Sequence, residues 1–189
     1  MNDETESVLN ELIETSKDGE KGFLKAAEDA KDASLKAMFT EGAQRCREGA
    51  RELQDLVRSV GGNPEKGGSL AGAMHRGWVS LKEAVAKRED KAILEEVEKG
   101  EDYAKAQYKK ALEQQLPPSV QAVVERQYRG VLSNHDRVRA LRDRYRASAE
   151  SDSTWGRQQA AAEPAGSTTT THGKKMVGED WPKSAQQED

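Results

Sequence analysis

Apolar side chains recur at spacings of three and four residues along most of this chain, the pattern of helices that bury one face. The pattern covers residues 4–31, 33–60, 69–87, 91–115 and 118–146. The sequences GGNPEKGG and LPPS interrupt it, and sequences rich in Gly and Pro end helices. The chain is therefore predicted to be all-α.

The predicted helices repeat in two pairs, the first with that at 91–115 and the second with the last. A shift of 81 residues places the pair Gly19 and Glu20 on the pair Gly100 and Glu101. A shift of 85 residues aligns the second predicted helix with the last one. These matches predict two antiparallel helical hairpins joined by a crossover that includes the helix at 69–87. This is the topology of a ferritin-like four-helix bundle.

The periodic pattern ends near residue 147. Residues 147–189 are a mixture of Ser, Thr, Ala, Gly and Pro, a composition that buries too little apolar surface to fold alone. We expect a helical bundle over residues 4–146, followed by a disordered C-terminal tail. Trp155 and Trp181 in this tail are either stray aromatic residues or part of a short docking motif.

Composition narrows the classes of function. Charged residues make up 34% of the chain, the mean hydropathy is -0.94 and the net charge is -4. Mixed charges without a basic patch argue against nucleic-acid binding, and no apolar run approaches the length that spans a bilayer. The acidic start MNDETESV lacks the features of a signal peptide. The single Cys46 excludes an internal disulfide, and we expect a soluble cytoplasmic protein with neither nucleic-acid nor membrane partners.

Glu20, Glu101 and His135 are candidate metal ligands. Ferritin-like proteins that bind two irons or manganeses use one inward Glu from each of two helices and a Glu-x-x-His pair from each of the other two. Glu20 and Glu101 match the single glutamates in helical phase and repeat position, and His135 matches the histidine of the last helix. Carboxylate oxygen and imidazole nitrogen are donors that these metals accept.

The rest of a two-metal set is missing. Leu132 stands three residues before His135, where a Glu is needed, and Arg51 stands three residues after Glu48, where a His is needed. Glu48 also falls near the solvent face of its helix, about 140° from Leu53. The sequence therefore predicts no standard two-metal centre.

What remains is a polar layer inside an apolar bundle. Its predicted members are Glu20, Glu101, His135, Asn134, Gln127 and Tyr108, with Cys46 nearby. One interpretation is a reduced site for a single metal, iron or manganese. The other is a buried hydrogen-bond network, because a carboxylate in a core needs a partner. Cys46 is either a redox thiol or a small core residue.

Several separated motifs resemble a known family in the same order. The sequences LIETSKDGEKGF, GSLAGAMHRGW, EKGEDYAKAQYKKAL and NHDRVRALRD are spread over residues 5–146. They resemble a bacterial family of ferritin-like four-helix-bundle proteins whose function is unknown. The resemblance implies a ferritin-like bundle that is cytoplasmic and forms a homodimer, and it implies no activity.

The sequence favours a non-catalytic role. No Gly-rich phosphate loop and no Ser-His-Asp arrangement stands out. The favoured hypothesis is a bundle that acts through assembly or protein contacts, with a link to stress. The alternative is a metal-binding or redox protein with a reduced carboxylate and histidine site. Only the second hypothesis predicts that replacing Glu20 or Glu101 lowers metal affinity.

Overall fold

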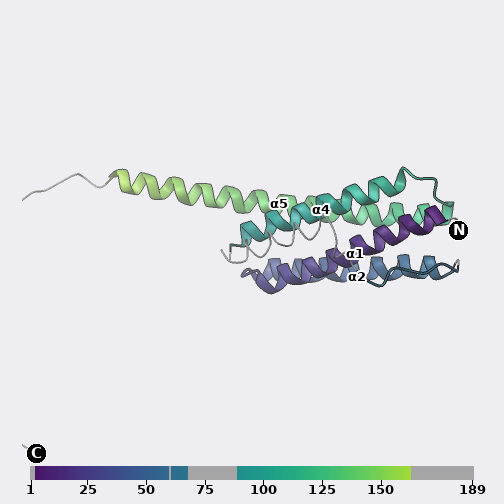
Figure 1. Cartoon of the computed structure of the whole chain (residues 1–189). Helices are drawn as coiled ribbons and strands as arrows, with labels where there is room; N and C mark the ends of the chain where they lie inside the picture. The colour runs from purple at the N-terminus through teal and green to yellow at the C-terminus, as the bar shows by residue number, and fades with distance from the viewer. Residues whose placement is uncertain (1–2, 60, 68–88, 163–189) are drawn as a thin grey trace, which may run out of the picture. The chain divides into compact units, whose positions relative to one another are not determined.

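The chain is helical in the part that the structure describes. The computed structural model describes residues 3–59, 61–67 and 89–162. These residues form α1 (Asp3–Asp29), α2 (Ala33–Ser59), α4 (Asp90–Leu112) and α5 (Pro118–Ala162), and they contain no strand (Figure 1). The predicted all-α fold is confirmed for these residues. The predicted crossover helix at 69–87 lies wholly outside the described residues.

Asp32 begins α2 by capping its first turn. Its Oδ1 accepts the backbone N–H of Ser34 at 2.7 Å and that of Leu35 at 3.3 Å, groups that have no partner within the helix. The Tyr145 hydroxyl donates to Oδ2 at 2.8 Å and ties this turn to α5. The pKa of Asp32 is lowered to about 2, chiefly by the hydrogen bond from the Ser34 hydroxyl and next by that from Tyr145.

α2 ends in a left-handed turn at Gly61, whose φ is 78°. The backbone N–H groups of Gly61 and Gly62 donate to the carbonyls of Arg58 and Val57, both at 3.0 Å. This pair of hydrogen bonds is a Schellman motif, in which glycine takes the left-handed position without the strain of a Cβ. The breaker sequence therefore ends the helix as predicted.

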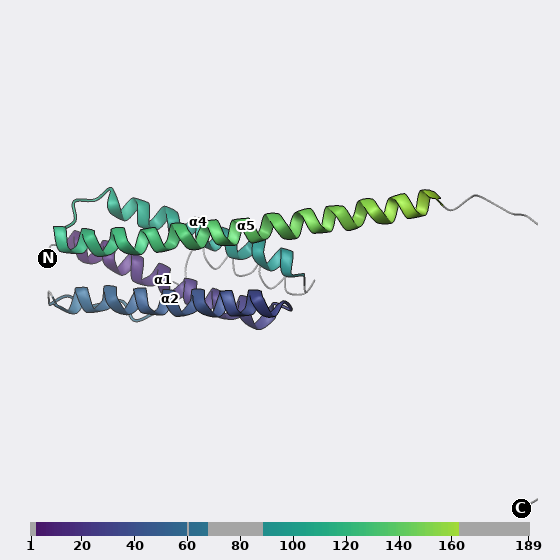
Figure 2. The same ribbon diagram turned by 180° about the vertical axis from the view of Figure 1, so that it is seen from behind.

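Within the compact unit Met1–Asp152, each of the described helices packs against two other described helices that run antiparallel to it (Figures 1 and 2). Two ion pairs join α2 to α5, Glu41 with Arg137 and Glu52 with Arg126. The residue numbers therefore rise in opposite directions along the two helices, which makes them antiparallel. Similar hydrogen bonds join the four neighbouring pairs: Glu20 to Arg47 (α1 and α2), Arg45 to Asn134 (α2 and α5), Tyr108 to Gln127 (α4 and α5), and Ser16 to Tyr108 (α1 and α4). It follows that α2 and α4 are parallel.

Parallel α2 and α4 require a link that returns along the bundle. Residues 61–67 begin this return beside α1 through three hydrogen bonds: Asn63 N–H to Glu6 at 2.9 Å, Glu65 N–H to Asn10 at 2.8 Å, and Lys17 Nζ to the Lys66 carbonyl at 3.0 Å. The contacts advance from Glu6 to Lys17 as the chain advances. The link therefore starts as the long crossover that the repeat predicts.

The core consists of two apolar clusters with a layer of small and polar residues between them. Phe39 and Leu94 belong to one cluster, and Leu12 and Leu53 to the other. All four side chains are at most 1% exposed. The layer between the clusters includes Ser16, Gly19, Cys46, Gly49, Glu101, Gln127 and Asn134. A polar layer is thus present and divides the core, but it does not include Glu20 and His135, which were predicted to belong to it.

α5 is longer than predicted. The sequence predicts that the bundle ends at residue 146 and that 147–189 are disordered, but α5 continues to Ala162. Ala stands at the start of this segment and QQAAA at its end, and both Ala and Gln are good helix formers. A helix can therefore continue where the apolar stripe has ended. Residues 163–189 lie outside the described part, and their disorder stays a prediction.

Candidate functional site

His135 on α5 faces two carboxylates of α4. Its Nε2 lies 3.0 Å from Asp102 Oδ1. Glu98, Asp102 and His135 each offer one ligand atom, and these atoms lie within 4.8 Å of one another. Glu98 and Asp102 share one side of α4 because residues four apart are neighbours on a helix surface. We call these three residues the carboxylate–histidine cluster, and it is the one group of this kind within the described residues.

Asp136 orients the His135 ring. Its Oδ1 lies 3.1 Å from His135 Nδ1, so a proton on Nδ1 is hydrogen-bonded there while Nε2 faces α4. A carboxylate on the second ring nitrogen is the common arrangement behind a metal-bound histidine. His135 is 4% exposed, whereas the Asp102 side chain is 57% exposed. The cluster therefore combines a buried imidazole with a carboxylate, that of Asp102, which is open to solvent.

Two cationic side chains balance the negative charge of the cluster. Arg142 forms an ion pair with Glu98. Lys105 Nζ lies 3.5 Å from Asp102 Oδ1 and 3.5 Å from His135 Nε2. A metal ion would have to displace the Lys105 ammonium, which can turn into solvent because its side chain is partly exposed.

The donor set fits a first-row divalent metal. Carboxylate oxygens are the hard donors that manganese and iron accept, and imidazole nitrogen suits iron among other metals. Three protein ligands would leave coordination positions for water. The residues of the cluster could therefore hold one such ion.

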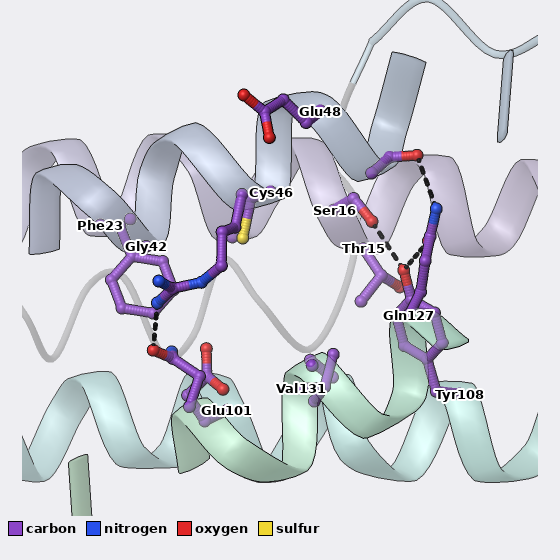
Figure 3. A pocket seen from close by; sticks show the side chains of 18 of the residues that line it. Thr15, Ser16, Phe23, Gly42, Cys46, Glu48, Glu101, Tyr108, Gln127 and Val131 are labelled. Carbon is purple, nitrogen blue, oxygen red and sulfur yellow. Dashed lines mark hydrogen bonds between the residues drawn. The ribbon is translucent and has the colours of Figure 1, made fainter. Parts of the chain in front are cut away.

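A pocket opens in the polar layer of the bundle (Figure 3). Its volume is about 620 Å³, within the ~300–1,000 Å³ range of small-molecule sites. Each described helix contributes glycine to its lining: Gly19 and Gly22 from α1, Gly42 and Gly49 from α2, Gly100 from α4, and Gly130 from α5. A Cβ built on Gly100 or Gly130 would meet no described atom within 4 Å, so the missing side chains leave this space open.

Gly19 and Gly42 have a packing role instead. A Cβ on Gly19 would lie 3.1 Å from Cys46 Sγ, and one on Gly42 would lie 3.0 Å from the ring of Phe23. These distances are shorter than ordinary van der Waals contact. Glycine at both positions therefore lets α1 and α2 pack closely beside the pocket.

Two side-chain bridges connect α2 with α5 across the pocket. Arg45 donates to Asn134 Oδ1. Gln127 Nε2 donates to the Gly49 carbonyl at 3.3 Å and to Glu52 Oε2 at 2.8 Å. All five residues line the pocket, so the two bridges enclose it on the side of α2 and α5.

The pocket reaches the surface between these bridges. Glu48 and Arg51 on α2 and Gly130 on α5 line it, and all three are exposed. The antiparallel run of α2 and α5 places residue 48 near residue 130. The exposed position of Glu48 agrees with the solvent face predicted for it.

Glu101 is a buried carboxylate at one end of the pocket (Figure 3). It is 6% exposed, and its Oε2 has no hydrogen-bond partner within the described part of the chain. Burial raises the pKa of Glu101 to about 7, although the side chains of Asn134, Arg45 and His135 act to lower it. Burying a hydrogen-bond acceptor without a donor costs free energy, so this oxygen is suited to receive a hydrogen bond.

Tyr108 lines the other end of the pocket with its hydrogen bonds complete. Its hydroxyl donates to Gln127 Oε1 at 2.8 Å and lies 3.2 Å from Ser16 Oγ (Figure 3). Since the Tyr108 proton goes to Gln127, Ser16 is the donor to Tyr108. Burial raises the pKa of Tyr108 above its usual range, and the phenol stays protonated.

One protein-family model, described as a domain of unknown function (DUF2383), matches residues 4–114. The chain belongs to the DUF2383 family. The matched segment of this DUF2383 protein includes Glu98, Glu101 and Asp102, whereas His135 follows it on α5. No curated protein sequence matches the chain. Among the described helices, none has a stretch long and apolar enough to cross a bilayer.

The structure of the DUF2383 protein separates the three predicted metal ligands. His135 belongs to the carboxylate–histidine cluster and Glu101 to the pocket. Glu20 forms an ion pair with Arg47, whose Nε lies 2.7 Å from Glu20 Oε1. Asn134 and His135 are adjacent and thus about 100° apart around α5, so Asn134 faces the pocket while His135 faces α4.

Cys46 is a shielded thiol beside the pocket. Burial chiefly, and the negative charge of Glu101 to a smaller extent, raise the pKa of Cys46 to about 12. The thiolate is the reactive form of cysteine. The environment therefore favours the core role over the redox role for Cys46.

Glu98 and Asp102 were not among the residues predicted from the sequence. Their spacing of four places them together on α4, but such acidic pairs are frequent on exposed helix faces. Only the packing of α5 brings His135 to them. The pocket is indicated more clearly by the sequence, because Gly19, Gly42 and Gly100 lie in the predicted buried stripes, where glycine adds no side chain to the core.

Proposed function

We propose that this DUF2383 protein is a ferritin-like bundle that binds one divalent iron or manganese ion through Glu98, Asp102 and His135. The observation that carries the proposal is the convergence of two carboxylates and one imidazole within 4.8 Å across α4 and α5. The Asp136 carboxylate behind His135 supports it. A bundle with one long crossover is also the arrangement of ferritin-like carboxylate proteins.

The proposed role is metal binding rather than catalysis. A bound ion would supply a Lewis-acid centre with open positions. The cluster lies toward solvent at Asp102, which suits reversible uptake of an ion. A cytoplasmic location, a homodimer and a link to stress accompany this proposal as predictions from the sequence.

Isothermal titration of the untagged protein with Mn²⁺, and with Fe²⁺ under anaerobic conditions, tests the proposal. His135→Ala and Asp102→Asn are each expected to lower the affinity for the metal about tenfold or more, since removing even a group that only hydrogen-bonds a metal ligand has an effect of that size. Glu48→Gln on the exposed face of α2 is the control and should bind as the wild type does. Equal affinity in all four proteins would overturn the assignment.

Glu20→Gln and Glu101→Gln test the ligand set predicted from the sequence, which shares only His135 with the cluster. Loss of affinity in these two variants, with none in Asp102→Asn, would indicate a metal in the polar layer instead. Absence of binding in the wild type would favour the bundle that acts through assembly or protein contacts.

A further inference from the structure

The pocket in the polar layer shares no lining residue with the carboxylate–histidine cluster. We propose that it binds a small uncharged organic molecule with a hydroxyl group at one end of an apolar body. The hydroxyl donates to Glu101 Oε2, and the body occupies the space between Phe23 and Val131. Both of these apolar residues line the pocket (Figure 3).

The unpaired oxygen of Glu101 defines the polar end of the ligand. A carboxylate is an acceptor with room for several hydrogen bonds, yet Oε2 is buried and has no partner among the described residues. Leaving such an atom unpaired is unfavourable. A ligand that brings one O–H group into the pocket would remove this cost.

The surroundings of Glu101 favour a neutral donor over an ammonium group. The Arg45 guanidinium crosses from α2 to Asn134 and acts electrostatically on Glu101. A ligand cation at the same place would be repelled by Arg45. A hydroxyl group satisfies the oxygen without adding charge.

The length of the pocket and the residues at its far end define the apolar body. Glu101 and Tyr108 are seven residues apart on α4, which is about 10 Å along the helix axis. Ala104 lies between them and lines the pocket. The Tyr108 end already has complete hydrogen bonds with Gln127 and Ser16, so no second polar group is needed on the ligand.

The opening between α2 and α5 supplies a route of entry. Gly130 is exposed and lines the pocket, and a Cβ there would meet no described atom within 4 Å. A small molecule can therefore pass this side of α5 without unfolding of the bundle.

Binding of two matched probes tests the proposal. 2-Naphthol and 2-methoxynaphthalene have the same apolar body, but only the first has an O–H donor. Wild type is expected to bind 2-naphthol about tenfold more tightly by calorimetry, which corresponds to about 1.4 kcal/mol. Glu101→Leu should bind both probes with equal affinity, because the apolar contacts remain and the acceptor is gone. Preference for the naphthol in Glu101→Leu would overturn the role of Glu101.

A filled pocket is the second arm of the test. Gly100→Leu, and Gly130→Leu as an independent variant, should lose about tenfold or more in affinity for both probes. Circular dichroism should show unchanged helix content in these variants. If wild type binds neither probe, or if folded Gly100→Leu and Gly130→Leu bind them as wild type does, the pocket holds water alone and the proposal fails. Tighter binding of 2-naphthylmethylamine than of 2-naphthol would overturn the uncharged class of ligand.

Discussion

The Tyr108 hydroxyl donates to Gln127 Oε1 at 2.8 Å and joins α4 to α5 in the middle of the bundle. The amide nitrogen of the same Gln127 reaches the Gly49 carbonyl of α2 at 3.3 Å. One glutamine therefore connects three helices at a level where the core has a pocket in place of apolar side chains. Tyr108 is 3% exposed, so water has little access to the hydroxyl that completes this connection.

Tyr108→Phe should lower the free energy of unfolding by about 1–3 kcal/mol, because it leaves the half-buried Gln127 oxygen and the buried Ser16 hydroxyl without their partner. Urea unfolding followed by circular dichroism measures the change. Tyr103→Phe, at a half-buried position on the same helix, is the matched control and should cost less. Equal losses in the two variants would show that the Tyr108 hydrogen bonds contribute no specific stability.

Replacement by alanine should have opposite effects on stability at two glycines of the pocket. Gly42→Ala should destabilise the bundle by about 1–3 kcal/mol, since its Cβ would lie 3.0 Å from the Phe23 ring and force the core to shift. Gly100→Ala should stabilise it by up to about 1 kcal/mol, because alanine favours the helix and its Cβ meets no described atom within 4 Å. Thermal unfolding of both variants checks the sign. A stabilising Gly42→Ala would contradict the close packing of α1 on α2.

Glu101 should make the bundle less stable as the pH rises. Burial raises its pKa from 4.5 to about 7 in the folded chain. Between these pH values the folded chain holds more protons than the unfolded chain, so stability falls as the pH increases and levels off above the folded pKa. The total change is roughly 3 kcal/mol at about 1.4 kcal/mol per pKa unit.

Glu101→Gln removes this titration. Urea unfolding at a series of pH values should show the variant gaining stability relative to wild type from about pH 4.5 to about pH 7. Gln keeps the shape of the side chain, which makes it a suitable neutral comparison. A stability difference that does not depend on pH would contradict the raised pKa.

Lys105→Gln should increase the affinity of the carboxylate–histidine cluster for Mn²⁺ by about three- to tenfold. The Lys105 ammonium lies 3.5 Å from His135 Nε2 and would repel an incoming cation. Two unit charges 4 Å apart interact by about 1 kcal/mol even in water. Lys109→Gln, an exposed position on the same helix, is the control. Unchanged affinity in Lys105→Gln would indicate that the metal binds away from this cluster.

The sequence by itself determined the helices and much of the interior. Spacings of three and four place Leu12, Phe39 and Leu94 on buried stripes, and these side chains are in the core. Glycine and proline mark the helix ends, since Gly61 adopts a left-handed turn that other residues resist. The repeated Gly-Glu pair identified Gly100 and Glu101 as interior residues, and both line the pocket. Local periodicity is sufficient for these features because each depends on a single helix.

Only the tertiary structure decided which interior residues meet. A stripe assigns a residue to a broad face of its helix, but it does not set the rotation of that helix against its neighbours. His135 therefore contacts Asp102, and Glu20 contacts Arg47, whereas the sequence pattern predicts both in one layer with Glu101. Adjacent residues of a helix diverge by about 100°, so a small rotation of α5 determines whether His135 or Asn134 faces the pocket. That rotation follows from the packing of all four helices, which no single segment of the sequence contains.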